Sequence, residues 1–101
     1  MEDKLHKIRI WAGHGTPRQF FVELEARLAQ KGREREYIAE GEGSTITCYR
    51  LGKVGGFLGI GVKQTKEPVL RVIFGENDVQ VPAEGADPAF VDWLVARLHQ
   101  H

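Results

Sequence analysis

The chain has 101 residues, with 14 basic and 14 acidic side chains and therefore no net charge at neutral pH. Binding of nucleic acid through its phosphates requires a broad basic surface, so this balance argues against nucleic acid as a partner. The length is that of one domain, and we expect residues 1–101 to form a single α+β domain.

The sequence predicts neither a membrane span nor a secretion signal. Its longest nearly apolar run, Val54–Val62, is far shorter than the roughly 20 residues that a spanning helix needs. The first residues, Met1–Lys4, include two acids and precede no apolar core, unlike a signal peptide. The single Cys48 cannot form an internal disulfide. We therefore expect a cytoplasmic protein that does not enter the membrane.

The N-terminal part predicts a short strand over Lys7–Ala12. Its apolar residues Ile8, Ile10 and Ala12 alternate with Lys7, Arg9 and Trp11, a pattern typical of a half-buried strand. The residues Gly13–Gly15 end this strand.

A helix is predicted over Thr16–Lys31. Thr16 suits the N-cap, Pro17 the first helical position, and Gln19 completes a capping box three residues after Thr16. Gly32 is placed to end the helix. The apolar stripe that follows at helical spacing consists of Phe20, Phe21, Leu24 and Leu28.

The middle of the chain predicts consecutive strands joined by tight turns. The turn residues are Gly41–Ser44, Gly52–Gly56, Lys66–Pro68 and Gly75–Asp78. The strands between and around them are Glu36–Glu40, Thr45–Leu51, Phe57–Thr65, Val69–Phe74 and the short edge piece Val79–Val81. Strands joined in this way form an antiparallel sheet.

A second helix is predicted near the C-terminus. Asp87 suits its N-cap and Pro88 its first position. Its apolar stripe is Phe90, Val91, Leu94, Val95 and Leu98, with Trp93 on the border. The element order is then β-α-β-β-β-β-(β)-α, which predicts a single antiparallel sheet of five to six strands with two helices packed on one face.

The other face of such a sheet would be open and is one candidate binding surface. We expect its apolar area to come from aromatic side chains, with Gly59 and Gly61 forming a shallow trough beside Phe57. The candidate groove or interface consists of Trp11, Tyr37, Tyr49, Phe57, Gly59 and Gly61. An exposed aromatic face of this kind is common in dimers and ligand sites.

The turn before the first helix is the second candidate site. It combines flexible backbone, a helix N-terminus, an imidazole, a hydroxyl and a guanidinium, which suit an anion or a small ligand. These candidate residues are Gly13, His14, Gly15, Thr16 and Arg18. The same residues have a structural interpretation, since Thr16 serves as a cap and Pro17 lacks an N–H donor.

No cofactor, metal or nucleotide motif is present in the sequence. The histidines His6, His99 and His101 lie near the termini at spacings that match no standard metal site. Cys48 follows Ile46 on one face of a strand and is expected to be a small buried hydrophobe rather than a nucleophile.

Three functions remain open from the sequence. The first is a small non-enzymatic binding module, homodimeric through its sheet, that binds a small ligand or a partner protein at one of the two candidate sites. The second is an enzyme that uses His14 with a carboxylate from another element. The third is a weak nucleic-acid-binding regulator that uses the N-terminal cations Lys4, Lys7, Arg9 and Arg18.

Overall fold

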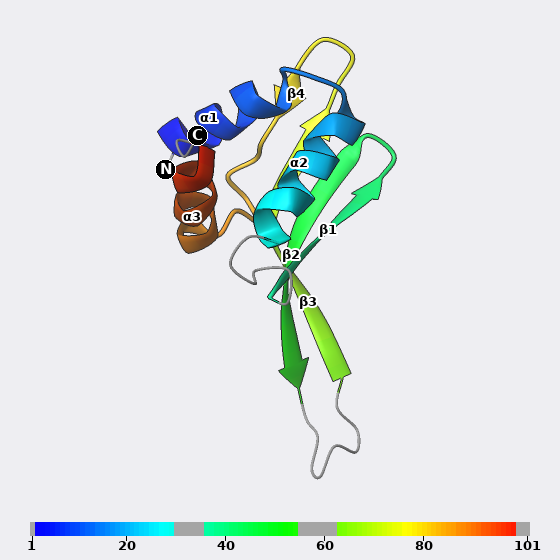
Figure 1. Ribbon diagram of the computed structural model, residues 1–101, viewed down its shortest axis with the longest axis vertical. Helices are drawn as coiled ribbons and strands as arrows, with labels where there is room; N and C mark the ends of the chain where they lie inside the picture. Colours follow the sequence, from blue (N-terminus) through cyan, green and yellow to red (C-terminus); the bar gives the residue numbers. More distant parts are fainter. Residues whose placement is uncertain (1, 30–35, 55–62, 99–101) are drawn as a thin grey trace.

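A computed structural model describes residues 2–29, 36–54 and 63–98 of the chain. Its elements, labelled in Figure 1, are α1 (Glu2–Ala12), α2 (Pro17–Ala29), β1 (Tyr37–Glu42), β2 (Thr45–Val54), β3 (Lys63–Phe74), β4 (Val79–Gln80) and α3 (Pro88–Leu98). The α+β class and the antiparallel sheet are confirmed, and the strands lie in the order β1-β2-β3-β4.

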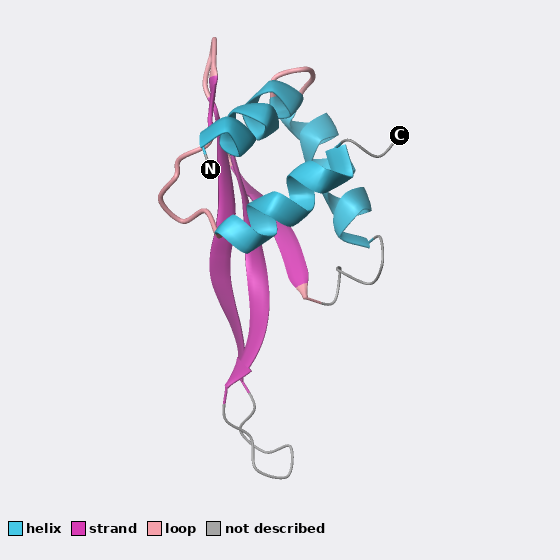
Figure 2. Cartoon of the chain, turned by 90° about the vertical axis from the view of Figure 1, so that its left-hand side faces the viewer, coloured by secondary structure: helices cyan, strands magenta, loops and turns pink. Residues whose placement is uncertain are grey.

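The sheet is covered by helices on one face only. Figure 2 shows the three helices on the same side of the strands. Helix α2 packs against β1, α3 packs against β3, and α1 lies against α2, α3 and β4. The described residues therefore hold three helices and four strands, where the sequence pattern predicted two helices and five to six strands. In these same ranges, no helix has the length and apolar character needed to cross a membrane.

The predicted strand Lys7–Ala12 is wrong, because these residues form the second half of α1. The residues that α1 buries are Leu5, Ile8 and Ala12, which follow a helical spacing of three and four. Ile10, which the alternating pattern placed beside Ile8, is instead 50% exposed. The helix closes with a bond from the Gly13 N–H to the Arg9 carbonyl (2.9 Å).

The predicted capping box at the start of α2 is confirmed. The Gln19 backbone N–H donates to Thr16 Oγ1 (3.1 Å), and the Thr16 N–H donates to Gln19 Oε1 (2.9 Å). Pro17 is the first helical residue, as predicted. The helix is described to Ala29, so the predicted end at Lys31 and Gly32 lies outside the described residues.

Removing the cap should weaken the fold measurably. We expect Thr16→Ala to lower the free energy of unfolding by about 1 kcal/mol, because the Gln19 N–H loses its acceptor. Arg18→Ala, in the same helical turn, is the control and should change it by less than about 0.5 kcal/mol. Urea unfolding of the two variants measures both values. Equal effects of the two substitutions would contradict the role given to Thr16.

The hairpin of β1 and β2 confirms the turn predicted at Gly41–Ser44, with a shorter turn than predicted. β1 extends into that range as far as Glu42, which pairs directly with Thr45, the first residue of β2. The two-residue turn is Gly43-Ser44, and Gly43 has a φ of 61°, a left-handed conformation that glycine adopts without strain.

The turn predicted at Lys66–Pro68 is wrong, because β3 runs unbroken through these residues. Cys48 pairs with Leu70 and the next residue, Tyr49, pairs with Pro68, so Val69 is the extra residue of a β-bulge. The outer edge of β3 pairs with β4 only at Ile73 and Phe74, so Pro68 removes no donor from a ladder on that side.

Because of the bulge, the side chains of two successive residues, Val69 and Leu70, are both buried in the core. Val69 and Leu70 are each 1% exposed, whereas regular alternation would turn one of them outward. The Val69 carbonyl accepts the backbone N–H of Asp87 (2.8 Å), which fixes the chain just before α3. The predicted strand Phe57–Thr65 is described only from Lys63, where it is the beginning of β3.

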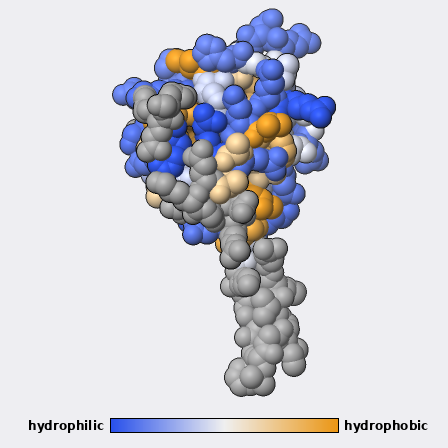
Figure 3. All heavy atoms as spheres, viewed as in Figure 1, coloured by the Kyte–Doolittle hydropathy of each residue, from blue (hydrophilic) through white to orange (hydrophobic). Residues whose placement is uncertain are grey.

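The hydrophobic core lies between the sheet and the helices. It contains the predicted stripes of both helices, apart from Phe21, Trp93 and Leu98 at its margin. Its buried members are Leu5, Ile8, Ala12, Phe20, Leu24, Leu28, Ile46, Cys48, Val69, Leu70, Val72, Phe90, Val91, Leu94 and Val95. On the face seen in Figure 3, hydrophilic side chains separate several smaller apolar patches.

Candidate binding site

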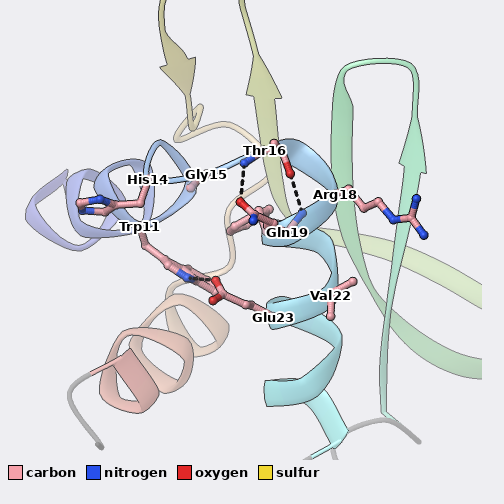
Figure 4. A pocket seen from close by; sticks show the side chains of 10 residues that line it. Trp11, His14, Gly15, Thr16, Arg18, Gln19, Val22 and Glu23 are labelled. Atoms are coloured by element: carbon pink, nitrogen blue, oxygen red, sulfur yellow. Dashed lines mark hydrogen bonds between the residues drawn. The ribbon is translucent and has the colours of Figure 1, made fainter.

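The turn predicted as a binding site connects α1 to α2. Gly15 lets the capping box close, since a Cβ atom there would lie 2.2 Å from Gln19 Oε1. The turn borders a hollow of about 590 Å³ between the end of α1 and the start of α2, shown in Figure 4. Its lining residues include four of the five that the sequence predicted, His14, Gly15, Thr16 and Arg18.

The hydrogen-bonding groups at the centre of this hollow are already paired. Thr16 and Gln19 bond each other, and the Trp11 indole N–H donates to Glu23 Oε2 (2.9 Å). At the start of α2, Pro17 has no N–H, and the Gln19 N–H is occupied by Thr16. Few donors are left for an anion at this helix end.

His14 and Arg18 do not converge on one point. In Figure 4 their side chains leave the turn in opposite directions. Within the described residues, no hydrogen bond or ion pair is recorded for the His14 imidazole or the Arg18 guanidinium. An acid–base pair needs a second polar group within hydrogen-bond reach of the imidazole, and the described part of the chain does not supply it.

A second hollow, of about 450 Å³, continues the first along the helices. The two share Trp11, His14 and Glu23. We call their combined surface the α1–α2 groove. It is lined by Lys7, Ile10, Trp11 and Ala12 of α1, by the turn residues His14, Gly15 and Thr16, by Arg18, Gln19, Phe20, Val22, Glu23 and Arg27 of α2, and by Leu98 of α3.

Apart from Ala12, the α1 residues that line the groove lie on a different face of the helix from the buried stripe. Lys7, Ile10, Trp11 and His14 are spaced by three and four residues, so they follow one side of the helix and its C-terminal turn. The buried stripe of α1 follows a different side. The sequence could have revealed this second face only after residues 2–12 had been recognised as helical.

Trp11 forms a fixed aromatic floor for the groove. Its ring packs edge-on against Phe20, with 4.7 Å between centroids, and the Arg27 guanidinium lies 4.7 Å over the ring. Arg27 Nη1 also donates to the Glu23 backbone carbonyl (3.3 Å). The indole is therefore held from two sides and by its own N–H, which leaves it little freedom to rearrange.

Two exposed apolar side chains line the hollows that share this floor. Ile10 is 50% exposed and Val22 is 56% exposed, and these are the two large hydrophobic residues recorded as exposed in the described ranges. Ile10 lines the second hollow and Val22 the first. Apolar surface that is left in water beside a rigid aromatic ring is typical of a surface that binds a partner.

The aromatic residues predicted to share the open sheet face lie in different places. Trp11 is on α1, not on the sheet. The ring centroids of Tyr37 and Phe90 of α3 are 4.8 Å apart, so the Tyr37 ring lies on the face of the sheet that the helices cover. Tyr49 lies on the open face, whereas Phe57, Gly59 and Gly61 are outside the described residues.

The open face has a polar hollow of about 630 Å³ around Tyr49. Lys66 spans it, with its Nζ 5.3 Å from the Tyr49 ring centre and 2.7 Å from Glu40 Oε2. The hydrogen bond to Glu40 raises the pKa of Lys66. The other residues that line this hollow are Gly41, Glu42, Thr45, Thr47, Arg71 and Ile73. The described part of this face is therefore less apolar than the sequence pattern predicted.

The remaining polar candidates do not form clusters. Lys4 is ion-paired with Asp92, and Arg9 Nη2 lies 2.6 Å from His6 Nδ1, so Lys7 is the one of these N-terminal cations that lines the α1–α2 groove together with Arg18. Cys48 is buried, and burial raises the pKa of its thiol to about 12. The described residues contain no cluster of His, Cys, Asp or Glu suited to a metal ion.

Comparison with protein-family models, curated proteins and solved structures finds no match to this chain. The functional argument therefore rests on the groove and the sheet face themselves.

Proposed function

We propose that this chain is a non-enzymatic binding module that receives an apolar segment of a partner protein in the α1–α2 groove. The observation that carries the proposal is the pair of exposed side chains, Ile10 and Val22, in the two hollows that share the fixed Trp11 ring. Fully burying a side chain of this size contributes about 1.5–3 kcal/mol, and about half of each is still exposed, so the two anchors together can contribute a similar amount to binding.

The groove supports this proposal better than the sheet face does. In the hollow of the open face, Lys66 and Glu40 bond each other across Tyr49, and a partner would have to break or cover that ion pair. Among the described residues that line the groove no ion pair is recorded, so a partner there would not have to break or cover one. Homodimerisation through the sheet, expected from the sequence, remains the alternative proposal for this face.

Selection of peptides from a displayed random library on the purified chain tests the proposal. We expect the selected peptides to bind Ile10→Asp and Val22→Asp at least tenfold more weakly than the wild type, because each change replaces an apolar contact with a charge. His6→Asp is the control, since His6 is exposed on α1 and lies outside the groove. Peptides that bind all three variants equally, or no enrichment, would argue against the groove.

A further inference from the structure

The charge around the groove identifies the chemical class of its partner, provided that the groove binds a protein segment as proposed above. Among the described residues that line it, the cations are Lys7, Arg18 and Arg27 and the one carboxylate is that of Glu23. These described lining residues thus carry an excess of two positive charges, whereas the chain as a whole has no net charge. The hollow of the open sheet face, by contrast, balances Lys66 and Arg71 against two glutamates.

The cations of the groove form no recorded ion pair with another described residue. In the described ranges, Lys7 and Arg18 make no recorded hydrogen bond or ion pair. Arg27 is held by the Trp11 ring and a backbone carbonyl, neither of which carries a negative charge. The Glu23 carboxylate already accepts the indole N–H. A partner with carboxylates beside its apolar anchors would match this distribution.

The walls of the groove also determine the backbone form of the partner. They are helices, whose backbone groups bond within each helix, so the groove has no strand edge that an extended peptide could join. A bound helix satisfies its own backbone and can present apolar side chains at i, i+3, i+4 and i+7. Two anchors of such a helix would lie one in each of the two hollows that share Trp11.

We infer that the α1–α2 groove binds an acidic amphipathic helix, with apolar anchors against Ile10, Trp11 and Val22 and carboxylates facing Lys7 and Arg18. Both cations are exposed, so this attraction acts through solvent and weakens as salt is added.

Three synthetic helical peptides with the same fluorescent label test this inference. The first has leucines at i, i+3, i+4 and i+7 and glutamates elsewhere, the second has lysines in place of the glutamates, and the third is the first with its order scrambled. We expect the acidic peptide to bind at least tenfold more tightly than the other two in anisotropy titrations at low salt. Its advantage over the lysine peptide should shrink when salt is raised.

Reversing the charge of the groove in the protein complements the change of charge in the peptides. The double change Lys7→Glu and Arg18→Glu should invert the preference, so that the lysine peptide binds better than the acidic one. Arg71→Glu makes the same kind of change on the open sheet face and should leave the preference unaltered. Inversion by the groove variant alone would support the inference.

Two outcomes would overturn it. Equal binding of the acidic and lysine peptides, lost in Ile10→Asp, would keep the groove as a binding site and exclude acidic recognition. Absence of peptide binding, together with a dimer in light scattering that Ile10→Asp dissociates, would identify a second copy of this chain as the occupant.

Discussion

Replacing Phe90 by alanine is expected to lower the free energy of unfolding by about 3–5 kcal/mol. Phe90 is 1% exposed and joins the last helix to the sheet, with ring centroids 4.8 Å from Tyr37 and 5.8 Å from Trp93. Alanine would leave a cavity at the point where α3 meets β1, and the surrounding rings could fill only part of it.

A second Phe→Ala change, at the margin of the core, is the control. It removes an aromatic ring of the same size without leaving a buried cavity. Phe21→Ala, on the partly exposed side of α2, should cost clearly less than Phe90→Ala. Urea unfolding, followed by circular dichroism, measures both variants. Equal losses would contradict the placement of Phe90 at the centre of the helix–sheet contact.

The second large effect expected is a loss of stability at alkaline pH that depends on Cys48. Its thiol has an ordinary pKa of 9.0, which burial in the folded chain raises to about 12. Between these values the unfolded chain releases the proton while the folded chain keeps it, so unfolding becomes easier as pH rises. The stabilisation is complete below pH 9.0 and is lost as pH rises towards about 12.

The expected slope is about 1.4 kcal/mol per pH unit within this window, or about 4 kcal/mol over its full width. Cys48→Ala is the comparison: it should be less stable than the wild type near pH 7 but fall less steeply above pH 9. The difference between the two stability curves removes the contribution of tyrosine and lysine titration. Parallel curves would show that the folded thiol ionises as readily as an unfolded one.

Local signals predicted the parts of the fold that depend on neighbouring residues. The capping box of Thr16 and Gln19 and the glycine turn of the first hairpin are formed by residues that lie within four positions of one another. Their geometry is dictated by the chain itself, so the sequence alone was sufficient to place them.

The errors arose where packing between distant elements overrides a local pattern. Ile8 and Ile10 favour a strand by their branched side chains, yet α1 is helical because Leu5, Ile8 and Ala12 then enter the same core. Lys66–Pro68 has the composition of a turn, yet it continues β3 because pairing with β2 and the bulge at Val69 accommodate the proline.

The same dependence on distant packing limited what the sequence could indicate about the candidate site. The turn at His14 was visible as unusual local composition, and it does border the groove. Ile10, Val22 and Arg27 could not be predicted as its neighbours, because their proximity depends on α1 being a helix and on its approach to α2. Tyr37 and Tyr49 could not be assigned to faces of the sheet without knowledge of the strand register.

The most direct test of the groove is a titration of the ¹⁵N-labelled chain with the acidic amphipathic peptide, followed by two-dimensional NMR. We predict that the largest shifts will be those of the Trp11 indole N–H and of the Ile10, His14 and Val22 amides, because these groups line the groove. Shifts concentrated instead at Thr47, Tyr49 and Arg71 would place binding on the open sheet face and contradict the proposal.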